Sequence, residues 1–543
     1  MANEDEGLTR RRFMHVGAAG VAGAVLLGCD DASDPDAGAM DAGGAADAGA
    51  MDAGAMDAGA DDAGQDAGAE DAGPPLSPLA IPTLEMGTVR ADGVRVHQLE
   101  MADGSMEFLD GLTTPTAGYN GDFLGPALML RTGEQVELNV TNRLGRVTTT
   151  HWHGMHVPAE MDGGPHQLIA DGETWTASFA VLNPASMCWF HPHAMGEVTD
   201  PRSTGHQVYM GLAGLLYIYD DESDALGLPS TYGVDDVPLV LQDRRFNPDG
   251  SFHHLDDPTD HDEVRKGGEF MVNGVITPAF DAGAQLVRFR ILNGSNARLY
   301  NLSVVDDTDA DRDFAVVGSD GGLLTAPVSL NRLELSPGER AEIVVDLSSD
   351  EGRSLRLVSR NDELINDNYS GRFQADEWDS LANPLMTIRV GAATAGAVTT
   401  LPSTLASFER IPESEAARTR EFLLGGPSMG NHLINGQRMD ITRTDEMVPL
   451  GDTEIWEIAN STSMAHPFHI HGQQFQVLSR SMGGEVPTHE LGWKDTVLVR
   501  RGEIVQVIKR HTDFADATGH FMYHCHILEH EDRGMMGQFV VLP

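Results

Sequence analysis

From about residue 79 onward, short segments of alternating hydrophobic and polar residues recur along the chain. Clear examples are EQVELNVTN, QLVRFRILN, AEIVVDLS and IVQVIKRH, each bounded by Gly, Asn, Asp or Pro. This period-two alternation predicts β-strands with one buried face, and the frequent turn residues favour sandwiches or barrels. The sequence contains no long amphipathic-helix pattern. We therefore predict an all-β protein.

The alternating part, residues 79–543, is long enough for three sandwich domains of ordinary size. A new block opens near residue 230, at STYGVDDVPLVLQDR, and another near residue 400, at GAVTTLPSTL. We therefore predict domains at residues 79–230, 231–398 and 399–543.

The N-terminus has a different pattern, in which arginines precede a short apolar run that ends at Cys29, in TRRRFMHVGAAGVAGAVLLGC. The run is too short to span a bilayer and fits an export signal. TRRRF resembles a twin-arginine signal, and LLGC resembles a bacterial lipobox. We expect an export signal at residues 1–29, a periplasmic or cell-envelope location, and membrane attachment only through a lipid on Cys29. The alternative is a plain cleaved signal with an incidental cysteine.

Residues 30–78 are rich in Asp, Ala and Gly, as in MDAGAMDAGADDAGQDAGAEDAG. Such a segment cannot bury enough apolar surface to offset its ordering entropy, so we predict a disordered linker. The whole chain has 83 acidic and 36 basic residues and a formal charge of -47. This charge repels nucleic acid and attracts small cations.

The chain contains three cysteines, Cys29, Cys188 and Cys525, which do not form a disulfide framework. Cys188 lies shortly before a pair of histidines, but its parity places it opposite His191 in an extended strand. We therefore predict that Cys188 is buried and reduced rather than a metal ligand.

Four short motifs concentrate histidines in the first and last thirds of the alternating region. They are HWHG (His151, His153), CWFHPH (His191, His193), HPFHIHG (His466, His469, His471) and HCHILEHEDRGMM (His524, His526, His530). A single His-X-His pair is weak evidence, but four such motifs in β-like or turn contexts indicate metal binding.

Alternation along a strand divides these ligands between two sites, because successive side chains point to opposite faces. In an extended HCH segment, Cys525 faces away from both flanking histidines. Cys525 and His466 can then share one site with His530, and Met535 is available. Two imidazoles, a thiolate and a weak axial methionine are typical of a blue-copper centre.

The other site receives the eight remaining motif histidines, which are too many for one metal and suit three. Zinc is the main competitor, but zinc sites use about four ligands and rarely methionine. The ligand set therefore favours copper.

At these residues the sequence resembles the multicopper oxidases, and particularly their bacterial three-domain branch of cuprous oxidases, laccases and bilirubin oxidases. The resemblance rests on HWHGMHVPAEMDGGP, CWFHPH, MGLAGLLYI, GWKDTV and HCHILEHEDRGMM. It implies three cupredoxin-like, Greek-key β-sandwich domains and four copper ions. By this resemblance the type 1 copper is held by His466, Cys525 and His530 with Met535 axial, the type 2 copper by His151 and His469, and the type 3 pair by His153, His191, His193, His471, His524 and His526.

The resemblance also implies a mechanism, in which electrons pass from the type 1 copper along Cys525 and dioxygen is reduced to water. Asp162, in AEMDGGP, and Glu531, directly after His530, match positions that relay protons in the family. Either residue could instead be a structural carboxylate.

The substrate is the least constrained expectation. The family's substrate-copper aspartate is replaced here by Thr462, although Met464 matches a methionine of that site. The region ESEAARTREFLLGGPSMGNHLINGQRMD is short and lacks a methionine- and histidine-rich insertion. These departures favour a laccase-like oxidase of phenols or aromatic amines over a cuprous oxidase for copper tolerance.

A third reading is a non-catalytic copper-binding scaffold, but scaffold relatives have lost the ligands that are all present here. As partners we expect dioxygen and a small reducing substrate, with no nucleic acid. We expect the protein to be a monomer.

Overall fold

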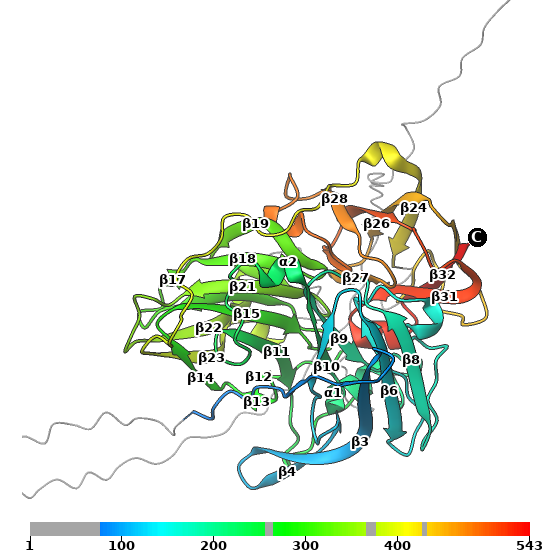
Figure 1. The fold of residues 1–543 in the computed structure, drawn as a ribbon. Helices are drawn as coiled ribbons and strands as arrows, with labels where there is room; N and C mark the ends of the chain where they lie inside the picture. Colours follow the sequence, from blue (N-terminus) through cyan, green and yellow to red (C-terminus); the bar gives the residue numbers. More distant parts are fainter. Residues whose placement is uncertain (1–75, 256–263, 365–375, 426–431) are drawn as a thin grey trace, which may run out of the picture. The chain divides into compact units, whose positions relative to one another are not determined.

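The computed structural model describes residues 76–255, 264–364, 376–425 and 432–543 (Figure 1). The predicted signal at residues 1–29, with Cys29, and the predicted linker up to residue 75 lie outside the described residues. Strands predominate in the described part, which confirms the all-β prediction. The helices of this part are short: α1 (Thr204–Met210), α2 (Asp221–Asp224), α3 (Leu528–Asp532), and the 3-10 turns η1 (Ala159–Met161), η2 (Asn361–Glu363), η3 (Glu377–Ser380), η4 (Glu413–Glu415) and η5 (Thr488–Glu490).

The described strands form three successive pairs of sheets, which we call the N-terminal, middle and C-terminal domains. In the N-terminal domain one sheet has the order β1 (Leu84–Glu85), β5 (Ala127–Arg131), β10 (Gly214–Tyr219), β9 (Ser186–His191) and β7 (His151–His153). The other has the order β2 (Thr88–Val89), β3 (Arg95–Leu109), β6 (Gln135–Arg143) and β8 (Thr174–Ala180), with β4 (Leu112–Tyr119) paired to β3.

The middle domain, drawn mainly in green in Figure 1, has the larger sheets. One runs β13 (Val275–Ile276), β12 (Glu269–Val272), β11 (Asp236–Arg244), β15 (Leu286–Asn293), β21 (Arg340–Asp346), β18 (Phe314–Ser319) and β19 (Gly322–Leu330). The other runs β14 (Ala279–Gly283), β23 (Ala382–Gly391), β22 (Ser354–Arg360), β16 (Tyr300–Val305) and β17 (Asp311–Arg312), with β20 (Leu333–Leu335) paired to β16.

The C-terminal domain, drawn in yellow to red, contains the last two sheets. One has the order β24 (Ala416–Leu424), β26 (Thr453–Asn460), β30 (Ile504–Arg510) and β28 (Gln476–Arg480). The other has the order β25 (Glu446–Pro449), β32 (Met536–Leu542), β31 (Asp516–Cys525), β27 (His466–Ile470) and β29 (Thr496–Val499).

Each domain encloses an apolar core of its own. The middle core extends from Leu228 to Leu405, the C-terminal core includes Trp456 and Phe468, and the N-terminal core includes Trp152. The domain limits at 230/231 and 398/399 stay predictions.

The four alternating segments quoted above become β6, β15, β21 and β30. In β6 the alternation is regular, because Val136, Leu138 and Val140 are buried and the residues between them are not. In β15 the sequence also alternates, but every residue of the strand is buried. Arg290 of β15 pairs with Asp236 at 2.7 Å and stacks 4.5 Å from the ring of Tyr217, in the N-terminal domain. The neighbouring domain therefore covers the polar face of this strand.

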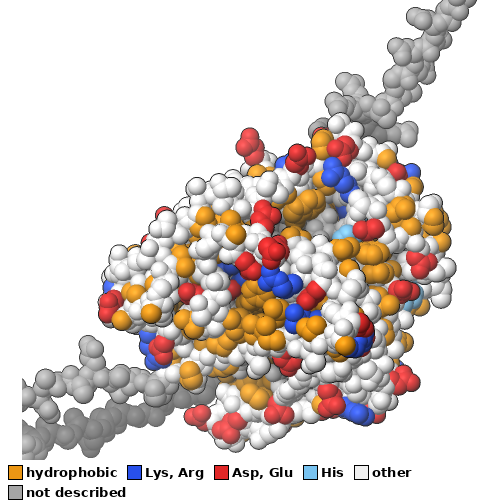
Figure 2. All heavy atoms as spheres, in the orientation of Figure 1, with side chains coloured by type: hydrophobic (Ala, Val, Ile, Leu, Met, Phe, Trp, Pro, Cys, Tyr) orange, Lys and Arg blue, Asp and Glu red, His pale blue; other side chains and the backbone are white. Residues whose placement is uncertain are grey.

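Acidic side chains are scattered over the face of the molecule shown in Figure 2 rather than gathered in one patch. Within the described ranges, no helix has both the length and the apolar character needed to cross a bilayer.

Candidate metal centres

Strand pairing brings the four histidine motifs together two by two. In the N-terminal domain β7 pairs with β9, which sets His151 opposite His191. In the C-terminal domain β27 pairs with β31, which sets His469 opposite His524 and Phe468 opposite Cys525. Each domain thus presents two ligand-bearing strands side by side.

The histidines of the two domains meet in one buried cluster. His193 Nε2 and His471 Nε2 each lie 3.2 Å from His524 Nε2. On the other side of the cluster, His526 Nε2 lies 3.2 Å from His153 Nδ1. The eight rings are at most 1% exposed: His151, His153, His191, His193, His469, His471, His524 and His526. The structure brings together all eight, and which copper each one holds stays a prediction.

Hydrogen bonds to backbone carbonyls orient several of these rings. In four of them Nδ1 donates to a carbonyl oxygen: His151 to Asp162 at 2.9 Å, His191 to Pro192 at 2.8 Å, His469 to Asp495 at 2.8 Å, and His524 to Cys525 at 3.0 Å. Such bonds place the proton on Nδ1 and leave the Nε2 lone pair free for a metal. The backbone therefore fixes which nitrogen of each ring faces the cluster.

The cluster fits a set of bound metal cations. The Nε2 atoms of His151, His191 and His469 are buried without a hydrogen-bond partner in the protein. The Nε2 lone pairs of His471 and His524 face each other at 3.2 Å, an unfavourable arrangement unless a cation binds them. Burial lowers the pKa of every ring in the cluster, so the imidazoles are neutral, as metal ligands must be. Imidazole donors suit copper and zinc rather than magnesium or calcium.

A second buried group lies in the C-terminal domain. Cys525 Sγ is 3.3 Å from His466 Nδ1 and 3.6 Å from His530 Nδ1. Met535 is fully buried beside them: its N–H donates to the carbonyl of His530, and its carbonyl accepts from the N–H of Cys525. Burial raises the pKa of the Cys525 thiol, so a bound cation is what would hold it as a thiolate.

The two groups are joined through the chain itself. Cys525 belongs to the second group, and its neighbours His524 and His526 belong to the cluster. His524 Nδ1 also donates to the carbonyl oxygen of Cys525 at 3.0 Å. One peptide segment therefore connects the thiolate site to the imidazole cluster.

The two predicted proton-relay carboxylates both lie at the cluster. Asp162 Oδ2 accepts from His471 Nδ1 at 2.6 Å. Glu531 Oε1 lies 3.2 Å from His193 Nδ1 and accepts from Thr204 Oγ1 at 2.8 Å. Burial raises the pKa of both carboxyl groups above the usual range. Their roles stay predictions.

Cys188 is buried and forms no disulfide in the described structure. Its thiol lies beside Ser186 at 3.9 Å and takes no part in the histidine groups.

Sequence reasoning missed Asp495, which contacts two histidines of the cluster. Its carboxylate lies 3.1 Å from His153 Nε2, and its carbonyl accepts from His469 Nδ1. Asp495 lies in the GWKDTV segment. An acidic residue directly before a strand is the sequence feature that could have identified Asp495 as a site residue. Arg340, which binds Asp495, comes from the middle domain and has no such signal.

The chain matches known proteins over most of its length. Two family models described as multicopper oxidase match residues 100–223 and 413–543. A multicopper oxidase of Staphylococcus haemolyticus is 35% identical over 457 residues, covering 83% of this chain and 89% of the relative. A cell division protein of Xenorhabdus nematophila is 34% identical over 428 residues, covering 78% of this chain and 85% of the relative.

Solved structures agree with these matches. A laccase-like multicopper oxidase from the lignin-degrading bacterium Ochrobactrum sp. has a TM-score of 0.74 and 38% identity, covering 86% of this chain and all of that one. A multicopper oxidase of the hyperthermophile Aquifex aeolicus has a TM-score of 0.76 and 31% identity, with the same coverage. The three sheet pairs are accordingly cupredoxin-like domains. The chain belongs to the multicopper oxidase family and is a copper-dependent oxidoreductase.

Proposed function

We propose that this protein is a laccase-like oxidase, which couples four one-electron oxidations of a phenol or aromatic amine to reduction of dioxygen to water. The observation that carries the choice of substrate is the contact between Thr462 and His466. Thr462 Oγ1 lies 2.8 Å from His466 Nε2, the ring nitrogen that faces away from Cys525.

A hydroxyl at this position does not favour a cuprous substrate. Thr462 Oγ1 also lies 2.8 Å from Asn460 Oδ1 and 3.0 Å from the carbonyl oxygen of Met464, so it belongs to a neutral hydrogen-bonded turn. A carboxylate here would add a charged ligand for a metal ion, whereas a threonine adds none. The Met464 side chain is buried, which leaves its thioether little access to a cation from solvent.

The chain after β24 also leaves little room for a metal-gathering insertion. Residues 426–431 lie outside the described residues, but both ends of this stretch are paired. The N–H of Gly425 donates to the carbonyl of Leu433 at 2.9 Å, and Leu424 bridges to Ile434. The described chain that leaves β24 at Leu424 is thus paired with it again at Ile434, in the region where cuprous oxidases of this branch carry extra methionines. The Ochrobactrum relative is described as having oxidase activity towards lignin model compounds, which supports the same choice.

The proposed copper set contains four ions. A type 1 copper would be held by His466, Cys525, His530 and Met535, a type 2 copper by His151 and His469, and a type 3 pair by His153, His191, His193, His471, His524 and His526. Bound copper supplies one-electron oxidation of the substrate and reduction of dioxygen. The protein excludes bulk water from the cluster, orients each ring by its outer hydrogen bond, and joins the sites through Cys525.

Asp162 and Glu531 are proposed to supply protons. Asp162 Oδ1 and Glu531 Oε2 are buried and have no hydrogen-bond partner, although the other oxygen of each carboxyl group is engaged. A proton held on either free oxygen lies next to the histidine cluster. Each carboxyl group can therefore deliver a proton where dioxygen is reduced.

Export by the twin-arginine route, a lipid on Cys29 and a cell-envelope location complete the proposal, together with a monomeric state. The export route, the lipid and the location rest on the N-terminal sequence motifs. They fit the function, because a tethered enzyme outside the cytoplasm meets phenolic substrates and dioxygen directly.

The test is a steady-state oxygen-uptake panel with cuprous ion, a bulky phenol and an aromatic amine. We expect turnover of the phenol and the amine to exceed turnover of cuprous ion. The opposite ranking would favour the cuprous-oxidase alternative. A colourless copper-treated protein that consumes no oxygen would favour the scaffold alternative.

A further inference from the structure

We propose that Arg340 of the middle domain is a positioning residue for the histidine cluster, and that it acts through Asp495. The middle domain contributes none of the predicted copper ligands. Its strand β21 nevertheless begins at Arg340, whose guanidinium lies between the two ligand-bearing domains. The side chain is 1% exposed.

All five N–H donors of this guanidinium are used, and they reach all three domains. Nε donates to the carbonyl of Met187 in the N-terminal domain at 3.2 Å. One donor of Nη1 and one of Nη2 go to the carbonyls of Gly338 and Asp320 in the middle domain, at 2.9 Å and 3.0 Å. The remaining two form a bidentate pair with the carboxylate of Asp495, at 2.7 Å and 2.5 Å. Lysine cannot reproduce this planar fork.

Asp495, held by Arg340, in turn orients two histidines of the cluster. Asp495 Oδ1 lies 3.1 Å from His153 Nε2, and the carbonyl of the same residue accepts from His469 Nδ1 at 2.8 Å. The first contact places the proton of His153 on Nε2, which turns Nδ1 toward His526 at 3.2 Å. His153 therefore faces the cluster through the opposite nitrogen from His469. A carboxylate held by an arginine is what selects this tautomer.

Two glycine positions show how closely the residues around Arg340 are packed. A Cβ added at Gly154, in HWHG, would lie 2.6 Å from Arg340 Nη2 and 2.8 Å from Asp495 Oδ2. A Cβ added at Gly338, in the turn before Arg340, would lie 2.9 Å from the ring of His526. The backbone of both domains therefore leaves room for the Arg340–Asp495 pair and for the cluster ring beside it.

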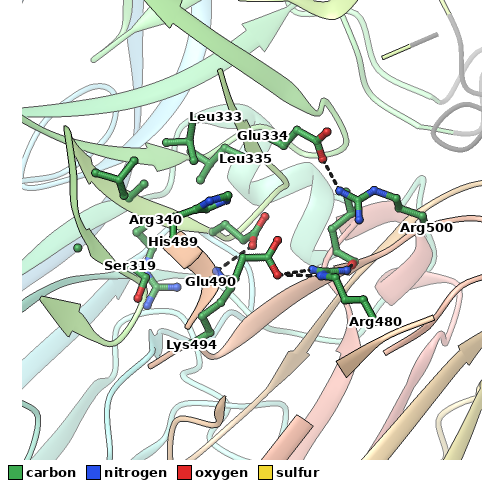
Figure 3. A pocket seen from close by; sticks show the side chains of 15 residues that line it. Ser319, Leu333, Glu334, Leu335, Arg340, Arg480, His489, Glu490, Lys494 and Arg500 are labelled. Atoms are coloured by element: carbon green, nitrogen blue, oxygen red, sulfur yellow. Dashed lines mark hydrogen bonds and ion pairs between the residues drawn. The ribbon is translucent and has the colours of Figure 1, made fainter. Parts of the chain in front are cut away.

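Ion pairs on the outer side of Arg340 anchor the middle domain to the C-terminal domain (Figure 3). Lys494 Nζ lies 3.0 Å from Asp320 Oδ2 and 2.9 Å from Glu339 Oε1. Asp320 Oδ1 in turn accepts from the backbone N–H of Arg340 at 2.8 Å. Arg340 is thus held from both sides, so it can act as a rigid support for Asp495.

The experiment compares the wild type with Arg340→Lys and with a matched control, Arg290→Lys. Arg290 is also a buried arginine of the middle domain in a bidentate carboxylate pair, at 2.7 Å to both oxygens of Asp236, and it faces the N-terminal domain. None of its hydrogen bonds or ion pairs is with a histidine of the cluster. Each protein is loaded with copper, and copper per chain, the blue absorption band and copper retention against a chelator are measured.

We expect Arg340→Lys to keep the blue band but to hold the cluster coppers about 10–100-fold more weakly, the usual effect of losing an outer-shell partner. Arg290→Lys should retain copper like the wild type. Unchanged retention in Arg340→Lys, or an equal loss in Arg290→Lys, would overturn the inference. If Arg340→Lys does not fold, Asp495→Asn replaces it: the same selective loss supports the inference, and full retention overturns it.

The inference about Arg340 rests on the proposed four-copper arrangement. The wild-type measurement distinguishes a failure of that arrangement from a failure of the inference. Wild-type protein that binds copper only at the blue site would overturn both. A fully loaded wild type together with a fully loaded Arg340→Lys protein would overturn this inference alone.

Discussion

His471 Nδ1 donates to Asp162 Oδ2 across 2.6 Å, although the two residues are 309 positions apart in the chain. The bond joins the N-terminal and C-terminal domains at the histidine cluster. Asp162 also accepts from His151 through its backbone carbonyl at 2.9 Å. One residue therefore holds one ring from each domain.

Asp162→Asn should slow dioxygen reduction by about 10²–10⁴-fold, because the amide cannot supply a proton. The blue band should remain, since Cys525 and its partners do not contact Asp162. Rapid-mixing measurement of reoxidation by dioxygen checks this expectation. The exposed Asp103→Asn is the control. Turnover equal to wild type with a good reductant would show that Asp162 is only structural.

Thr462→Asp should raise turnover of cuprous ion relative to a phenol by roughly tenfold, the equivalent of one interaction of about 1.4 kcal/mol. The new carboxylate would lie beside His466 Nε2, where Thr462 Oγ1 now lies at 2.8 Å. Thr462→Asn, which is polar and uncharged, serves as the control. If both variants keep the wild-type substrate ratio, the residue at position 462 does not select the substrate.

Gly154→Ala should lose more stability than its backbone conformation alone explains. Gly154 has φ +88°, and an added Cβ would meet the Arg340–Asp495 pair. Gly172 has a similar φ of +80° but open space around it, so Gly172→Ala measures the backbone cost of about 1–3 kcal/mol by itself. Chemical denaturation of both variants gives the difference. Equal losses would mean that the pair moves aside without penalty.

Removal of copper should lower the thermal midpoint of the protein. The apoprotein keeps buried ring nitrogens without partners, such as His151 Nε2 and His191 Nε2, and each costs about 1–3 kcal/mol. Ligand binding to the folded state alone removes this penalty and adds to stability. Calorimetry of chelator-treated and reloaded protein provides the comparison. Identical midpoints would indicate that the cluster does not bind copper when folded.

Local periodicity accounts for what could be predicted from the sequence. Alternation in HCH places Cys525 on one side and His524 and His526 on the other, and a strand obeys this rule wherever it lies in the fold. The alternation of β6 follows from the same physics. These features depend only on near neighbours in the chain.

The features that sequence reasoning missed depend on contacts between domains. The polar side of β15 is buried because Tyr217 of another domain covers Arg290. Arg340 and Asp495 meet across 155 positions, and neither belongs to a ligand motif. The place of Asp495 directly before a strand could have marked that residue alone. No local pattern reports which surface a neighbouring domain covers, so its pairing with Arg340 and the burial of β15 emerge only from the three-dimensional structure.

The stoichiometry of the reaction of the copper-loaded protein with a phenol tests the proposed four-electron oxidase activity. Substrate radicals formed and dioxygen consumed are measured together in the same sample. We expect a blue protein that oxidises four substrate molecules per dioxygen and releases no hydrogen peroxide. A colourless protein without oxygen uptake, or a ratio of two with peroxide as product, would contradict this expectation.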